Sequence, residues 1–163
     1  MNVKKTWALI IALVMCISAM GGCSGEVVTE QPTGGELRMG LAVMTGETEE
    51  NDVLVVAVAV DEAGVIRDCV IDEITEQEDR LESKMQLGER YGMKQASSIG
   101  KEWNEEAAAF AEYVKGKTMD QVAGIGVNEE GKPVDTDLRA SVTISVSRFL
   151  KGVEQAVNNA ENR

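Results

Sequence analysis

An uninterrupted apolar run, VLVVAVAV at residues 53–60, most limits the folds open to this chain. Its β-branched valines favour an extended backbone, and a run of this length is typical of a strand buried on both faces. The polar turn DEAG and a second strand-like stretch, VIRDCVIDEI at 65–74, follow directly. Because glycine tolerates a positive φ in a tight turn, the whole segment predicts a β-hairpin.

A further strand is expected before the hairpin and helices after it. LRMGLAVMTG, residues 37–46, predicts the strand, and the acidic ETEEND at 47–52 predicts a solvated loop. That loop lacks the spaced oxygen ligands and central glycine of a calcium site. The polar stretch 75–100 predicts irregular structure, and the acids around it predict a wet surface rather than a metal site: Glu73, Glu76, Glu78, Asp79 and Glu82.

Three helices are predicted in the second half of the chain. Residues 101–116 place an apolar stripe at helical spacing, while Glu105, Glu106, Glu112 and Lys115 are expected to face water. Residues 118–124 predict a short helix that begins with a capping box of Thr118 and Gln121. A second apolar stripe predicts a last helix over about 141–160. Strands followed by helices indicate an α+β fold, a small antiparallel sheet with helices packed on one face.

The first 22 residues have the pattern of a secretory signal. Lys4 and Lys5 precede an apolar stretch, 7–19, that is too short for a comfortable membrane span, and small residues end it. MGGC at 20–23 resembles the lipobox of bacterial lipoproteins, which implies that Cys23 carries the lipid; the alternative is an ordinary signal with a chance cysteine. The expected organisation is a lipoprotein signal peptide at 1–22, a lipidated cysteine and flexible tether at 23–35, and a domain at 36–163.

A lipidated Cys23 would place the protein at the cell membrane, on its extracytoplasmic face. Stable anchoring needs more than one acyl chain, and a diacylated or triacylated cysteine, palmitate included, meets that need. Cys16 would leave with the signal, so Cys69 would be the one thiol left and no internal disulfide could form. Cys69 lies in an apolar stretch and is expected to be a buried core residue rather than a reactive thiol.

Charge and composition exclude several functions. The formal net charge is −12, which opposes binding to nucleic acid and to anionic head groups, so the lipid would hold the protein at the membrane. Histidine is absent from the sequence, which removes the commonest general base and metal ligand. No nucleophile with a histidine partner and no metal-ligand spacing is recognisable, so a hydrolase has little support.

The stretch DLRASVTIS, residues 137–145, is the candidate binding site. It stands at the expected start of the last helix, where unpaired amides and the helix dipole favour a phosphate. Ser141, Thr143 and Ser145 would supply hydroxyls beside it. The alternative is that these residues are ordinary N-caps.

This stretch also resembles the FMN-binding domain family, extracytoplasmic flavin domains of quinone reductases, Rnf complexes and related bacterial lipoproteins. Asp137, Leu138 and Thr143 match the family motif, in which FMN is joined through its phosphate to the threonine. Ala140, Ser141 and Val142 depart from its Ser/Thr-Gly-Ala. The hairpin and the stretches LGERYGMKQASSIGKEW and FAEYVKGKT are similar to family segments, and the resemblance covers about residues 40–160.

The resemblance implies an electron carrier, in which FMN supplies the chemistry and the chain orients it. FMN would be bound covalently through Thr143 or reversibly, with Asp137, Ser141 and Ser145 nearby and a redox protein as partner. Tyr91 is a candidate for stacking on the flavin ring, the alternative being a packed loop anchor, whereas Trp103 is expected in the core. The alternative function is a cofactor-free binding or structural envelope lipoprotein with the same fold.

Overall fold

The computed structural model describes residues 35–46 and 52–162, and Gly34–Arg163 form one compact unit. The predicted signal peptide, Cys23, most of the tether and most of the acidic loop, residues 47–51, lie outside the described residues. None of the helices within the described ranges has the length and apolar character needed to cross a bilayer.

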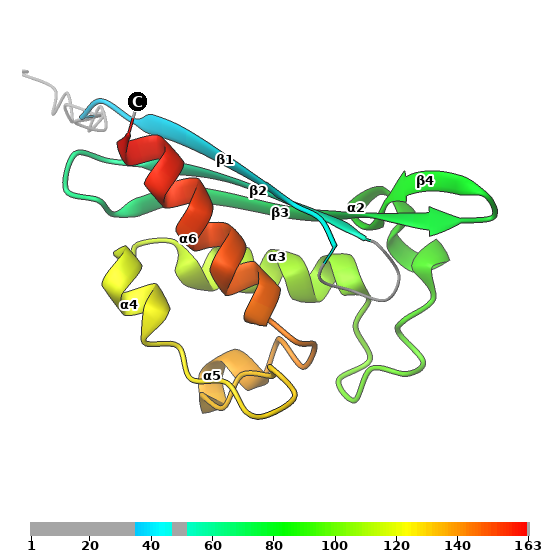
Figure 1. Cartoon of the computed structure of the whole chain (residues 1–163). Helices are drawn as coiled ribbons and strands as arrows, with labels where there is room; N and C mark the ends of the chain where they lie inside the picture. Colours follow the sequence, from blue (N-terminus) through cyan, green and yellow to red (C-terminus); the bar gives the residue numbers. More distant parts are fainter. Residues whose placement is uncertain (1–34, 47–51, 163) are drawn as a thin grey trace, which may run out of the picture. The chain divides into compact units, whose positions relative to one another are not determined.

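Four antiparallel strands form one sheet in the order β1-β2-β3-β4 (Figure 1). The strands are β1 (Arg38–Met44), β2 (Val53–Val60), β3 (Ile66–Gln77) and β4 (Arg80–Ser83). The predicted hairpin is the β2–β3 pair: Asp61 Oδ1 accepts the amides of Ala63 and Val65, and Gly64 has a φ of +74°. The fold is therefore α+β, as the sequence predicts.

The region after the first hairpin is more ordered than predicted. β3 continues to Gln77 and pairs with β4, so residues 74–83 form a second hairpin in place of irregular structure. Glu78 and Asp79 make its two-residue turn with φ values of +49° and +62°. A short helix α2 (Lys84–Leu87) and a 3₁₀ turn η1 (Gly88–Tyr91) follow.

Helices cover one face of the sheet. α3 (Trp103–Val114) contacts β3, and α6 (Ser147–Glu161) lies along β1 and β2 (Figure 1). α4 (Met119–Ala123) and α5 (Thr136–Arg139) lie between them in the chain. The predicted capping box of Thr118 and Gln121 is confirmed at the start of α4.

The last helix begins later than predicted. α6 starts at Ser147, so the expected start near Ser141 is wrong, and residues 140–146 form an irregular segment after α5. The reason is that amides in this segment bond elsewhere: Val146 donates to the carbonyl of Gly131, and Thr143 donates to the carboxylate of Glu106. The candidate threonine consequently lies before the helix and not in its first turn.

The core lies between the sheet and α3 and α6. Trp103, Phe110 and Phe149 meet there, with the Trp103 and Phe149 rings edge to face at 5.8 Å between centroids. At Gly40, α6 comes so close to β1 that a Cβ on this residue would overlap the carbonyl oxygen of Ala156.

The opposite face of the sheet is not fully covered. β2 buries Leu54, Val56 and Val58 toward the helices, but on its other face three of the four side chains are only half-buried, so the prediction of burial on both faces is wrong. Neighbouring strands expose further apolar side chains on the helix-free face: Met39, Leu41, Val43 and Val70.

Candidate functional site

A cavity of about 510 Å³ opens beside Thr143. This volume falls within the range of roughly 300–1,000 Å³ that is typical of small-molecule sites. The lining mixes apolar side chains with a few polar ones, as such sites usually do. The lining residues are Met93, Ala96, Ser97, Ser98, Glu106, Asn128, Lys132, Pro133, Val134, Arg139, Val142, Thr143 and Ile144.

Thr143 reaches this cavity from the irregular segment between α5 and α6. The side chain is half-buried, and Val142 and Val146 on either side are fully buried in the core. The two valines hold the segment against the core, and their burial accounts for the fixed position of the threonine between them.

Glu106 is the acidic group of the cavity. Its side chain is 0% exposed, and its Oε2 accepts from the amides of Thr143 at 2.5 Å and Ile144 at 3.0 Å. The hydroxyl of Thr143 is 3.1 Å from Oε2, and the hydroxyl of Ser97 donates to Oε1 at 2.9 Å. Both carboxylate oxygens are thus occupied by neutral donors.

α3 explains why two buried glutamates are stable here. Glu102 caps the helix and Glu106 lies one turn further, near the positive end of the helix dipole, which favours negative charge. Glu102 accepts from the amides of Met93 at 2.8 Å and Lys94 at 3.1 Å, as Glu106 does from the other loop. The first turn of α3 therefore fastens two loops around the cavity through charge-assisted hydrogen bonds.

Glu106 corrects the expectation that it faces water. It lies three residues after Trp103 and four before Phe110, so helical spacing places it on the buried stripe. That spacing was the signal in the sequence, but a carboxylate on an apolar stripe is ordinarily expected to turn toward solvent.

Two cationic side chains lie among the lining residues. Arg139 comes from the last turn of α5, and Lys132 comes from the turn before it and pairs with Glu130 at 2.7 Å. Asn128 orders that turn, since its Oδ1 accepts the amides of Glu130 and Lys132. The cavity thus combines cationic side chains with a carboxylate that is already hydrogen-bonded.

The other predicted site residues do not line this cavity. Asp137 is exposed on α5, and the hydroxyl of Ser141 donates to the carbonyl of Leu138 at 3.3 Å. Ser145 is exposed and lies against Gly131. Tyr91 lies beside Lys84, whose Nζ is 4.9 Å from the ring centroid. Trp103 is buried in the core, as expected.

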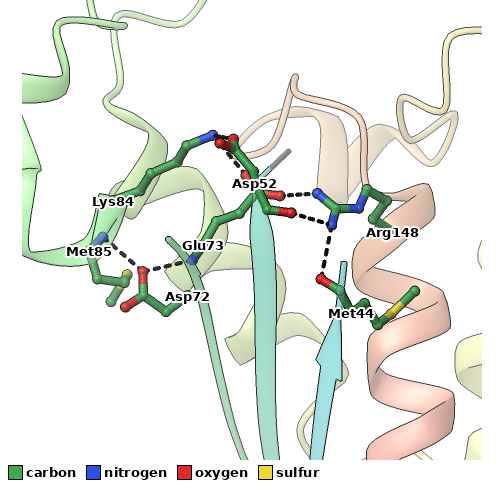
Figure 2. Close-up of polar contacts among 7 residues, drawn as sticks. All are labelled: Met44, Asp52, Asp72, Glu73, Lys84, Met85 and Arg148. Atoms are coloured by element: carbon green, nitrogen blue, oxygen red, sulfur yellow. Dashed lines mark hydrogen bonds and ion pairs between the residues drawn. The ribbon is translucent and has the colours of Figure 1, made fainter. Parts of the chain in front are cut away.

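A second polar cluster joins the sheet to the helices (Figure 2). Lys84 Nζ lies 2.6 Å from Asp52 and 2.8 Å from Glu73, and Glu73 also pairs with Arg148 of α6. Arg148 donates in addition to the carbonyl of Asp52 at 3.1 Å. Since Arg148 also donates to the carbonyl of Met44 at 3.4 Å, the cluster ties the end of β1 and the start of β2 to β3, α2 and α6.

Burial and charge act in opposite directions on Lys84. Desolvation lowers its pKa, but the hydrogen bonds of Asp52 and Glu73 and the charge of Glu73 outweigh this, and the net pKa is raised. Glu73 is 7% exposed, so the expectation that it belongs to a wet surface is wrong. It points inward because it shares the helix-facing side of β3 with Ile71 and Thr75.

Cys69 is buried on β3, as the sequence predicts. Desolvation, with a smaller contribution from the charge of Asp68, raises the pKa of its thiol to about 12. At neutral pH the group is therefore a protonated apolar side chain, and the thiolate that reacts and binds metal is scarce.

Comparison with known proteins adds no family to this description. Neither a scan against protein-family models nor a search of curated proteins finds a match. Within residues 35–46 and 52–162, no cluster of three or more acidic or cysteine side chains is arranged to hold a metal ion.

Proposed function

We propose that this chain is a membrane-anchored extracytoplasmic lipoprotein whose FMN-binding-like domain binds FMN or a related nucleotide reversibly and passes electrons to a partner protein. The cavity of about 510 Å³ at Thr143 carries the proposal. It lies at the threonine that the motif resemblance singles out, and Lys132 and Arg139 line it with positive charge. The anchor rests on the signal pattern and on Cys23.

Reversible binding is favoured over a phosphoester on Thr143. The hydroxyl of Thr143 donates to Glu106, whose carboxylate is fully buried. A phosphate esterified to that hydroxyl would stand beside this carboxylate, and like charges in a poorly solvated place repel strongly. Arg139 and Lys132 offer a phosphate an alternative position, with charge-assisted hydrogen bonds.

The test is a titration of FMN with the domain that begins at Gly34, in which the fluorescence of the flavin reports binding. Saturable quenching that weakens tenfold or more in Arg139→Ala supports the proposal, and the absence of quenching contradicts it. Expression with a flavin transferase, followed by mass measurement, tests the covalent mode. Added mass that disappears in Thr143→Ala would show that the phosphoester forms despite Glu106.

A second function is a cofactor-free envelope lipoprotein of the same fold. Glu106 favours it, because the donors of Thr143, Ile144 and Ser97 are already satisfied within the chain. A site whose donors are satisfied is stable without a ligand. A purified protein without visible absorption, and without any response to FMN, would support this second function over the first.

A further inference from the structure

We propose that Glu106 is a built-in anion that fills the donor group of Thr143, Ile144 and Ser97 and so determines where a ligand phosphate can bind. By this inference a phosphate entering the cavity is excluded from Thr143 and binds against Arg139 and Lys132. The inference deepens the proposed function and rests on it for the nature of the ligand. Its core, the exclusion of an anion by Glu106, can be tested without any flavin.

The donor group has the composition of an anion site. Two consecutive amides, at Thr143 and Ile144, point to the same oxygen of Glu106, and hydroxyls of Thr143 and Ser97 complete the set. Adjacent backbone amides that converge on one point form a concavity that binds anions. Here the anion is a carboxylate from α3, distant in the sequence.

Occupation and charge both keep a second anion away. Glu106 is wholly buried and contacts only neutral donors in this group, so its charge is not cancelled by a cation there. A phosphate would have to displace the carboxylate from the two amides and remain close to it. The cationic lining residues offer phosphate a position that leaves Glu106 in place, and there phosphate has only to replace the exposed carboxylate of Glu130 at Lys132.

Two substitutions separate occupation from charge. In Glu106→Gln the carboxamide oxygen can still accept the two amides, and its NH₂ can donate to the hydroxyls, which also accept. The amides therefore stay occupied although the charge is gone. In Glu106→Ala the amides are left open to the cavity. Glu112→Ala, which removes an exposed glutamate of the same helix, is the matched control.

The experiment follows the amide resonances of Thr143 and Ile144 while inorganic phosphate is added to the ¹⁵N-labelled domain that begins at Gly34. That segment is one compact unit and contains the whole described core. Sodium chloride at equal ionic strength is the reference. We expect saturable shifts of these two amides in Glu106→Ala, with at least tenfold higher phosphate affinity at this position than in the wild type, Glu106→Gln and Glu112→Ala.

If Glu106→Ala is partly unfolded, phosphate should restore its folding beyond the effect seen in Glu112→Ala, because a ligand of the native state stabilises it. Equal affinity in all four proteins, or no affinity in Glu106→Ala with no restored folding, overturns the inference. If phosphate binds Glu106→Gln and Glu106→Ala with equal affinity, the charge of Glu106 excludes phosphate and its occupation of the two amides does not.

The FMN titration tests the proposed function independently of the phosphate experiment. If FMN fails to bind while Glu106→Ala gains phosphate affinity, the flavin function is wrong and the exclusion by Glu106 holds. If FMN binds the wild type while Glu106→Ala gains nothing, the reverse is true.

Discussion

Glu106 and Thr143 are 37 residues apart in the chain, yet the carboxylate of the first accepts both the amide and the hydroxyl of the second. This contact fixes the segment before α6 to the first turn of α3. It also gives the candidate threonine a hydrogen-bond partner within the protein. The position of Thr143 and the availability of its hydroxyl therefore depend on Glu106, a residue that no local motif includes.

Removal of the Glu106 carboxylate should destabilise the domain. Glu106→Ala leaves the part-buried donors of Thr143, Ile144 and Ser97 without their acceptor, and we expect the free energy of unfolding to fall by about 3 kcal/mol. Glu106→Gln preserves most of these bonds and should cost about 1 kcal/mol. Urea denaturation measures both, with exposed Glu112→Ala as the control near zero. Equal losses in Glu106→Ala and Glu112→Ala would contradict the hydrogen-bonded geometry.

The contact between β1 and α6 depends on Gly40. A Cβ at this position would overlap backbone atoms of Ala156, which cannot move without displacing the helix. Gly40→Ala should therefore lower the free energy of unfolding by about 3 kcal/mol. Gly124→Ala is the control, since its nearest atoms are at 3.5 Å and its φ is −78°; it should change stability by less than about 0.5 kcal/mol. If Gly40→Ala leaves the free energy of unfolding unchanged, α6 must pack further from β1 than described.

Lys84 should be one of the most sensitive charged residues. Lys84→Met removes the ammonium group that pairs with the buried carboxylates of Asp52 and Glu73 and leaves Glu73 with Arg148 alone. Breaking such a buried pair costs about 3–5 kcal/mol. Lys94→Met removes an exposed lysine 3.5 Å from Glu89 and should cost about 0–1 kcal/mol. Thermal and urea denaturation at pH 7 compare the two. Similar small losses in both variants would count against a buried cluster.

The pH dependence of the Lys84 contribution follows from the direction of its shift. Its folded-state pKa is raised, so the stabilisation is fully present below the unfolded-state pKa of about 10.4 and is lost as pH rises through the folded-state value. The difference between wild type and Lys84→Met should accordingly stay constant from pH 7 to about 9. A difference that shrinks over this range would contradict the raised pKa.

Cys69 should be almost inert in the folded domain. With the pKa of its thiol at about 12, the thiolate fraction at pH 8 is on the order of 10⁻⁴, compared with about a quarter for a thiol of ordinary pKa 8.5. Disulfide reagents at pH 8 should therefore modify native protein at least a hundredfold more slowly than protein in urea. The folded-state pKa of Cys69 lies above the unfolded-state value. Its contribution to the free energy of unfolding is therefore fully present below about pH 8.5 and is lost as pH rises from there through about 12. Fast native modification would place Cys69 at the surface.

The periodicity of apolar residues predicted the strands and helices that bury an apolar face. The β2–β3 hairpin, α3 and the capping box of α4 were predicted because alternation, helical spacing and local turn chemistry fix them within a few residues. The second hairpin was missed, since the one apolar residue of β4, Leu81, is exposed and no apolar alternation marks this short strand.

The candidate site was predicted only in part. Thr143 was found through its motif, but the start of α6 depends on hydrogen bonds to Glu106 and Gly131, which local propensity does not reveal. Glu73 and Glu106 were expected at the surface because acidic side chains are rarely buried. Their burial depends on partners such as Lys84, Arg148 and Ser97 that come together only in the folded chain.

The most direct measurement is the equilibrium titration of the domain with FMN, followed by flavin fluorescence and by the amide resonances around the cavity. The account predicts saturable binding that shifts residues lining the cavity at Thr143, weakens at least tenfold in Arg139→Ala, and adds no mass to the chain. Absence of binding, or binding that leaves the resonances of Thr143 and Arg139 unchanged, would contradict it.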